Sequence, residues 1–335
     1  MLKKVFTTLF LFVLCCPGFA QITVPAKETI NNLVFPSDYK TSQLGAIPKY
    51  VKSGTGKLAM ILIPGLGFDA DVFKDFMAAN YLKYTMYVVT IPGYGHTQAP
   101  PLPVAGTSYG EQAWNTGIIA GLTKLIEREK MLRPVILGHF VQGTQLALQM
   151  AITHPSLIGG VIIIGGPAKF IYIDHGTPKP LQLKSMIANT DNYMAPKWFK
   201  VISHEDFNAG NYLPEIYSLD TVKNKKLWQQ TALVPLPVMI QYLCEFFATD
   251  ITLSFVGIRC PVLVLRPGFN DKILDASINN YVRPQFIESW EKAASENPFF
   301  TIKTIPDAAC FLWMDKPAEV NAEIDRFISR TSGMR

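Results

Sequence analysis

The stretch that decides the fold is residues 135–143, VILGHFVQG. Its apolar beginning continues the run from Pro134 and predicts a buried strand over residues 134–137. Two glycines bound the part that follows, which predicts a sharp turn over residues 138–143 and a helix over residues 144–153. A strand, a tight turn and a helix in direct succession are typical of a parallel sheet covered by helices.

The same alternation extends on both sides of this turn. Upstream, apolar runs predict strands at residues 58–63 and 84–91, and helices at residues 71–79 and 109–130. Downstream, strands are expected at residues 161–164, 261–265 and 299–305, and a last helix at residues 317–329. The pattern predicts an α/β fold with a mainly parallel central sheet flanked by helices.

The alternation stops between residues 167 and 253, where strong strands are missing and aromatic residues are frequent. We expect a helical lid inserted into one core domain, with most of the aromatics forming the lid's own core and a few facing an apolar pocket. The expected organisation is a signal peptide (1–20), a first core segment (21–166), the lid (167–253) and a second core segment (254–335).

Four turns resemble motifs of the α/β-hydrolase family. Residues 61–67 (ILIPGLG) resemble its first oxyanion turn, and residues 90–97 (TIPGYGHT) resemble its Asp-x-Pro-Gly-x-Gly-x-Ser turn. The stretch 135–143 resembles the nucleophile elbow, and residues 305–317 (IPDAACFLWMDKP) resemble the loop that carries the catalytic histidine. The resemblance extends over about residues 45–330 and implies the α/β-hydrolase fold, with its lid.

The resemblance also shows that the family's catalytic positions are substituted. Phe140 stands at the nucleophile position, Gln142 at the second glycine of the elbow, and Cys310 at the histidine position. Phenylalanine cannot attack a carbonyl, so we expect either a relaxed elbow or a ring that plugs the pocket floor. None of the five histidines follows His204, so the general base of the triad is missing.

Other site positions carry over with alternatives. Asp271, in the turn GFND after a predicted strand, is either the family's acid or an ordinary turn residue. The backbone N–H groups of Leu66 and Val141 match the oxyanion-type donors. His96 and Gln142 are candidates for the pocket wall.

Three functions remain open on this basis. The first hypothesis is a catalytically degenerate homologue that binds a small apolar ligand. The second is a hydrolase or related enzyme with relocated catalytic groups, among them Cys310, Thr144 or His96, acting on a small ester-like substrate. The third is a scaffold that binds a partner. Ordinary serine-hydrolase chemistry is not expected from any of them.

The composition argues against other classes. A formal charge of +5 over 335 residues, without a basic block interleaved with aromatics, gives no sign of nucleic-acid binding. The stretch GLGFDA at residues 65–70 matches a dinucleotide fingerprint only superficially, because no acidic residue ends the next strand. The cysteines lack zinc-like spacing. We therefore expect no cofactor and no metal.

The first twenty residues have the pattern of a secretory signal peptide. Lys3 and Lys4 precede an apolar run at residues 5–16, and a small-x-small end predicts cleavage after Ala20. The run is too short to cross a bilayer as a helix, so no integral span is expected. Cys15 and Cys16 raise the alternative of a lipid anchor, which Leu14 disfavours. The sequence predicts an exported protein.

Overall fold

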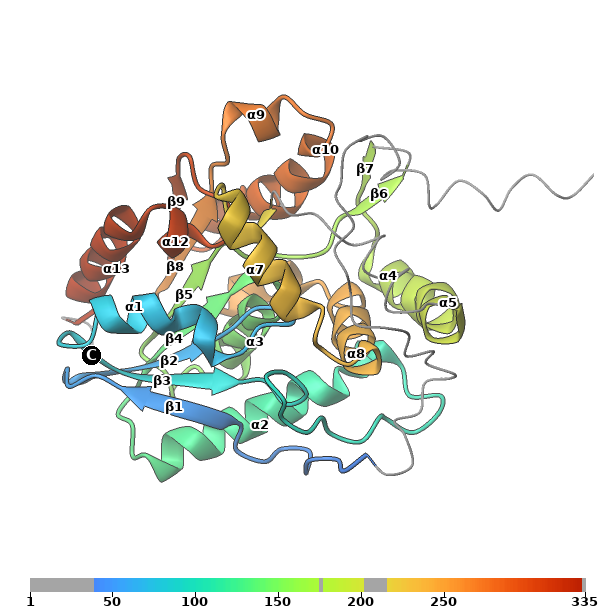
Figure 1. Cartoon of the computed structure of the whole chain (residues 1–335), viewed down its shortest axis with the longest axis horizontal. Helices are drawn as coiled ribbons and strands as arrows, with labels where there is room; N and C mark the ends of the chain where they lie inside the picture. Colours follow the sequence, from blue (N-terminus) through green and yellow to red (C-terminus); the bar gives the residue numbers. More distant parts are fainter. Residues whose placement is uncertain (1–38, 175–176, 202–215, 333–335) are drawn as a thin grey trace, which may run out of the picture.

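A central β-sheet organises the molecule (Figure 1). The computed structural model describes residues 39–174, 177–201 and 216–332; the predicted signal peptide, His175 and His204 lie outside these ranges. Among the described residues, seven strands form this sheet in the order β1-β3-β2-β4-β5-β8-β9. Their bounds are β1 Lys49–Ser53, β2 Leu58–Ile63, β3 Tyr84–Thr90, β4 Val135–His139, β5 Gly160–Ile164, β8 Val262–Pro267 and β9 Phe300–Ile305.

The pairing confirms the predicted mainly parallel sheet. Strand β1 runs antiparallel to β3, and every other pair in the sheet is parallel. All six strands that were predicted from apolar runs are present within one or two residues of their expected ends. Strand β1, which is half-exposed or exposed along its length, was not predicted.

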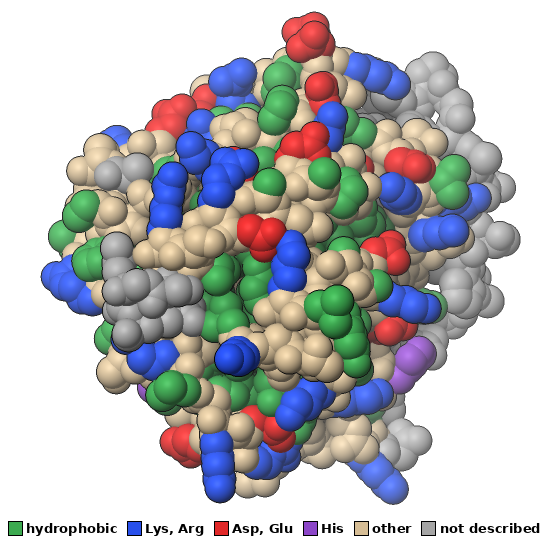
Figure 2. All heavy atoms as spheres, turned by 90° about the vertical axis from the view of Figure 1, so that its left-hand side faces the viewer, with side chains coloured by type: hydrophobic (Ala, Val, Ile, Leu, Met, Phe, Trp, Pro, Cys, Tyr) green, Lys and Arg blue, Asp and Glu red, His purple; other side chains and the backbone are tan. Residues whose placement is uncertain are grey.

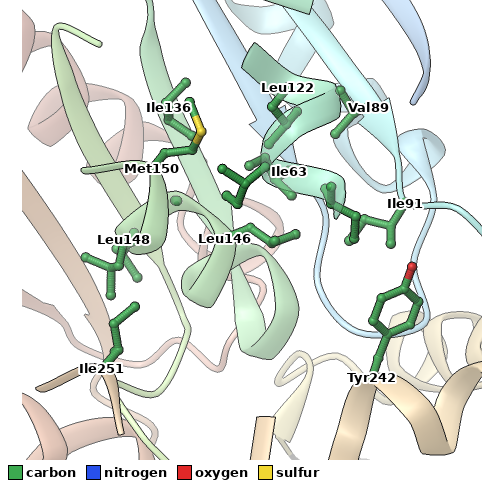
Figure 3. Close-up of a cluster of buried hydrophobic side chains, with 14 of the residues drawn as sticks. Ile63, Val89, Ile91, Leu122, Ile136, Leu146, Leu148, Met150, Tyr242 and Ile251 are labelled. Atoms are coloured by element: carbon green, nitrogen blue, oxygen red, sulfur yellow. The ribbon is translucent and has the colours of Figure 1, made fainter. Parts of the chain in front are cut away.

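Alternating side chains divide the interior into two hydrophobic cores. On β2, Ile61 and Ile63 point to one face of the sheet, while Met60 and Leu62 point to the other. The first face is covered by α2 (Ala113–Arg128) and α3 (Phe140–Thr153), and Figure 3 shows β strands, α2 and α3 contributing aliphatic side chains to it. The other face is covered by α1 (Lys74–Ala79) and α13 (Pro317–Ser332), as Figure 1 shows.

The helix boundary at the elbow differs from the prediction. Helix α3 begins at Phe140, directly after β4, whereas the sequence predicted a longer turn and a helix from residue 144. The turn is shorter because the chain reverses at a single residue, Phe140, whose φ is +52°. Residues 141–143 are therefore helical, despite the glycine at 143 that suggested a loop.

The chain between β5 and β8 is mainly helical where the structure describes it, with one short antiparallel hairpin that was not predicted. The elements are β6 Tyr172–Asp174, β7 Thr177–Lys179, α4 Leu183–Asn189, the π-helix η3 Thr190–Met194, α5 Ala195–Val201, α7 Thr221–Thr231, α8 Leu236–Phe247 and the 3-10 helix η5 Ile251–Gly257. Helix α8 packs against α2 and α3, so this segment shares a core with the sheet. Its role as a lid, and the expected boundaries at 167 and 253, stay predictions.

Short helices complete the described chain: η1 Ala70–Phe73, η2 Tyr109–Glu111, α9 Asp271–Leu274, α10 Asn279–Val282, η6 Arg283–Ile287, η7 Glu288–Trp290, α11 Ala293–Glu296 and α12 Leu312–Asp315. Within the described ranges, no single helix has the length and apolarity to cross a bilayer, although α8 and η5 together meet those criteria with a 56° bend between them. The described cysteines, Cys244, Cys260 and Cys310, are all buried and free.

Candidate active site

The elbow between β4 and α3 keeps a strained backbone. Phe140 has a φ of +52°, in the left-handed region that costs a bulky residue roughly 1–3 kcal/mol. The chain is tightly packed beside this turn: a Cβ atom added at Gly143 would lie 2.3 Å from the carbonyl oxygen of Ile63. The elbow is not relaxed, and its geometry still projects the side chain at position 140 from the turn.

The Phe140 side chain is buried in a group of aromatic rings. Its ring stacks on Phe286, with 5.9 Å between centroids and 9° between planes, and meets Tyr217 edge-on at 5.8 Å. Phe68 contacts Phe140, Tyr217 and also Phe311, whose ring centroid is 4.9 Å away. We call these five residues the aromatic cluster. Only 4% of Phe140 is exposed, so rings fill the space in front of the elbow.

His139, the residue before Phe140, is a buried and weak base. Its ring lies beneath Phe311 and Trp313, with centroids 4.3 and 4.6 Å away, and it is fully buried. Neither ring nitrogen forms a hydrogen bond of ordinary geometry with a described residue. Burial lowers the pKa of His139 to about 3, an effect that the backbone of Cys310 opposes. Such a weak base holds a proton poorly at neutral pH.

Cys310 is fully buried in the loop after β9. Its N–H donates to the carbonyl of Ile216 at 2.9 Å, and the next N–H, of Phe311, donates to the carbonyl of Tyr217 at 2.7 Å. Burial raises the pKa of the Cys310 thiol well above its ordinary value, and the nearby charge of Asp315 raises it further. The thiol is therefore protonated at neutral pH and is a poor nucleophile.

Asp315 holds this arrangement together, and no sequence motif singled it out. Its carboxylate accepts hydrogen bonds from the Ser218 hydroxyl at 2.5 Å, the Leu219 N–H at 3.2 Å and the Ala309 N–H at 2.9 Å. Residues 216–219, which we call the cover segment, are thereby attached to the loop that contains Cys310. Tyr217 of the cover segment closes the aromatic cluster.

The turn that carries Asp271 lies beside the same loop. The Phe269 N–H donates to the Ala308 carbonyl at 2.9 Å, and the Asp307 N–H donates to the Phe269 carbonyl at 3.1 Å. Asp271 itself is exposed at the first position of α9, and its carboxylate forms no hydrogen bond or ion pair with the described residues. The two loops are adjacent, but no base is oriented by Asp271.

The remaining predicted positions are dispersed. Leu66 is half-buried in the turn after β2, and Val141 is buried at the second position of α3, where backbone N–H groups lack an intrahelical acceptor. His96 is exposed, with a φ of +59°. Gln142 is fully buried, and its side-chain amide donates to the side-chain oxygen of Asn115 on α2.

Gln142 thus belongs to a buried polar network that the sequence analysis missed. The centre of the network is Glu245 on α8, whose carboxylate accepts the N–H groups of Trp114 at 2.8 Å and Asn115 at 2.9 Å, at the start of α2. Gln241 adds a third donor at 3.0 Å. Burial raises the pKa of Glu245 to about 7, although these donors act in the opposite direction. One acid in the apolar stretch 236–247 was the available signal.

A metal site is not evident in the part of the chain that the structure describes, because no three His, Cys, Asp or Glu side chains are grouped to hold an ion. Among the described residues, the site therefore offers a buried group of aromatic rings, the backbone of Leu66 and Val141 and a buried thiol, and no nucleophile lies in contact with a base.

Known proteins resemble this chain more in structure than in sequence. No family model matches the chain. A stretch of 117 residues, 35% of the chain, is 25% identical to a pimeloyl-[acyl-carrier protein] methyl ester esterase from Edwardsiella ictaluri, and it spans only 40% of that relative's length.

Solved structures match far more of the chain. A thermophilic esterase from Thermogutta terrifontis aligns with a TM-score of 0.60 and 18% identity, over 84% of this chain and 93% of its own. Hydrolases from Pseudomonas aeruginosa and Oleispira antarctica align with TM-scores of 0.63 and 0.62 and identities of 14% and 15%. These alignments cover 83% and 87% of this chain, and 93% and 99% of theirs. At such identities the likeness establishes architecture rather than activity. The chain has the α/β-hydrolase fold.

Proposed function

We propose that this protein is a non-hydrolytic protein of α/β-hydrolase fold that binds a small apolar molecule at the aromatic cluster. The observation that carries the proposal is the ring of Phe140, which stands on a strained elbow and packs against Phe286 and Tyr217. A strained turn usually persists where a side chain must be presented. Here the side chain presented is apolar, and so are its neighbours.

The absence of hydrolysis follows from three features of the site. Phe140 offers no nucleophile, the buried thiol of Cys310 is protonated, and His139 is too weak a base at neutral pH. Acyl transfer needs a nucleophile in contact with a base near pH 7. The backbone donors at Leu66 and Val141 polarise a carbonyl but attack nothing.

Ligand entry in this proposal requires movement of the cover segment. Tyr217 lies against Phe140 and Phe311, and two backbone hydrogen bonds together with Asp315 hold it there. An apolar ligand replaces the ring contacts of Tyr217 with its own. Charged or strongly polar ligands are excluded, because the cluster offers them few partners.

The second candidate, an enzyme with relocated catalytic groups acting on a small ester-like substrate, draws on the esterases among the similar proteins. It has weaker support. The Thr144 hydroxyl is buried and has no hydrogen-bond partner among the described residues, and His96 is exposed. Neither group contacts a base or a nucleophile that would activate it.

Export through the predicted signal peptide is a separate part of the proposal, tested by sequencing the mature N-terminus for cleavage after Ala20.

The chemical part is tested with short p-nitrophenyl esters. We expect the wild type and Cys310→Ala to show the same rate, close to that of buffer, across pH 6–9. The double variant Phe140→Ser, Cys310→His restores two members of the triad, and the triple variant with Asp271→Asn is its control. Enzymatic turnover by the wild type that Cys310→Ala abolishes would disprove the proposal and establish the relocated mechanism.

The binding part is tested by titration with a fluorescent apolar probe, N-phenyl-1-naphthylamine. Tyr217→Ala opens the cluster and should increase the affinity for the probe several-fold. Tyr193→Ala is the matched control, because Tyr193 is 71% exposed on η3. If the wild type and Tyr217→Ala both fail to bind the probe while remaining folded, the aromatic cluster is only a core.

A further inference from the structure

A groove formed by residues between Pro261 and Thr331 is lined by both apolar and basic side chains. These residues follow the elbow by more than a hundred positions in the sequence. The groove lies between α13 and the last two strands of the sheet and has a volume of about 290 Å³. This is close to the lower end of small-molecule pockets, which measure roughly 300–1,000 Å³. Figure 2 faces the side of the molecule that carries α1 and α13, and it shows basic side chains around exposed hydrophobic surface.

Apolar residues from all three elements form the floor. Pro261 and Leu263 come from the β8 side, Phe299 from directly before β9, and Phe327 from α13. The Phe327 ring reaches the start of β5, since a Cβ atom at Gly160 would lie 3.4 Å from its Cζ. Phe299 remains 38% exposed, so this floor is only partly covered.

The floor stays uncovered because β9 is the last strand of the described sheet, and no further strand lies beside it. Its neighbour β8 contacts α13, and in the parallel register Leu263 pairs with Thr301. Thr301 and Lys303 point the same way along β9, since side chains two residues apart share a face. The helix thus covers β8 and leaves a furrow over β9.

The rim of the furrow carries positive charge. Lys303 lies on β9, and Arg326 and Arg330 lie one turn apart on α13. Arg326 is paired with Glu323 at 2.6 Å. Lys303 and Arg330 are exposed and have no acidic partner among the described residues. With one acid and three bases, the net charge at the rim is +2.

We propose that this groove binds an anionic amphiphile: a carboxylate or phosphate monoester head on a short alkyl chain. The alkyl chain lies on Leu263, Phe299 and Phe327, and the head meets Lys303 and Arg330. Charge-assisted hydrogen bonds to such a head are about twice as strong as neutral ones. Neither a bare anion nor a neutral alcohol satisfies both halves of the groove. This site is independent of the aromatic cluster and of the function proposed there.

The test is calorimetric titration of the full chain with octanoate and with octyl phosphate, with octanol, acetate and inorganic phosphate as partial ligands. We expect saturable binding of both octyl anions and at least tenfold weaker binding of the partial ligands. The double variant Lys303→Gln, Arg330→Gln should lose about tenfold in affinity for the octyl anions. Thr301→Trp, which fills the furrow, should abolish binding.

Two controls make the result specific. Lys225→Gln, Lys272→Gln removes the same charge from exposed sites on α7 and α9 and should leave binding unchanged. Each variant's melting temperature without ligand verifies folding. If octanol binds equally to the wild type and to the groove variants but differently to Tyr217→Ala, its binding site is the aromatic cluster and not the groove.

Four outcomes overturn the proposal. The first is no binding of either octyl anion to the folded wild type. The second is binding that Thr301→Trp and the double variant leave intact. The third is binding only by a chain that ends at Ser332, which would identify residues 333–335 as the natural occupant. Binding to anionic vesicles without binding to monomeric octyl anions would likewise replace the proposed ligand with a membrane surface.

Discussion

Phe140 and Phe286 stack in nearly parallel planes, 9° apart, in front of the elbow between β4 and α3. The pair joins the elbow at the start of α3 to η6, which belongs to the last part of the chain. Both rings are buried, so Phe140 contributes to the interior of the molecule.

The first prediction concerns that contribution to stability. Phe140→Ala should lower the free energy of unfolding by about 3–5 kcal/mol, because it removes a buried ring and leaves a cavity. Urea unfolding at 25 °C measures the change. Leu82→Ala is the control, since Leu82 is 81% exposed and its truncation should change stability by less than about 0.5 kcal/mol. A loss below about 1 kcal/mol for Phe140→Ala would show that the ring is not packed as described.

The second prediction isolates the backbone strain at the elbow. In an ordinary helix glycine is less stable than alanine by about 1 kcal/mol. At a φ of +52° the order should reverse, because the left-handed conformation penalises any side chain by roughly 1–2 kcal/mol. Phe140→Gly should therefore be at least as stable as Phe140→Ala in the same urea experiment. If Phe140→Ala were more stable than Phe140→Gly by about 1 kcal/mol, as in an ordinary helix, the elbow would be relaxed.

Glu245 provides the third prediction, a dependence of stability on pH. Its pKa in the folded protein is about 7, above the ordinary value of 4.5, so the folded state binds the proton more tightly than the unfolded state. The stability from this group is complete below about pH 4.5 and falls as the pH rises to 7, by about 3 kcal/mol at most. Glu245→Gln cannot titrate.

Between pH 4.5 and 7.5 the unfolding free energy of the wild type should therefore fall relative to that of Glu245→Gln. The variant gains on the wild type as the pH rises. Glu319→Gln, at an exposed position on α13, should follow the wild type throughout. A constant difference between wild type and Glu245→Gln across this range would contradict the assignment of the titrating group.

The fourth prediction concerns the cover segment. Asp315→Asn removes the charge that accepts hydrogen bonds from Ser218, Leu219 and Ala309, and such bonds are worth about 1.5–3 kcal/mol each. Opening of residues 216–219 should expose Cys310, so its alkylation by iodoacetamide should accelerate at least tenfold. Peptide mapping by mass spectrometry distinguishes Cys310 from Cys244 and Cys260, whose unchanged labelling is the internal control.

The sequence predicted the parts of this fold in which neighbouring residues carry the signal. Strands β2, β4 and β5 are buried on both faces and appear as continuous apolar runs. Strand β1, KYVKS, lies at the sheet edge with its side chains mostly outside the core, so no such run marks it. The start of α3 was placed four residues late because the turn depends on one backbone angle, which glycines in the motif obscure.

The candidate site divides in the same way. Phe140 and Cys310 were singled out from local motifs, and their catalytic meaning stays a prediction; the structure places both in buried surroundings. Tyr217, Phe286 and Asp315 act through contacts with distant segments, about which local patterns carry no information. Glu245 was also missed, although here a local signal existed, since a single acid in an apolar helix usually has buried partners.

The placement of residues 165–261 between two adjacent strands has a kinetic consequence. Strands β5 and β8 pair side by side, yet this whole segment must be closed as a loop before they meet. Loop closure of this length delays pairing, since the entropy is lost before the contacts form. Strands β1 to β5 can assemble while β8 is still being synthesised, and their exposed β5 edge then waits for a partner. Refolding of the whole chain should therefore be most prone to intermolecular strand pairing at this edge.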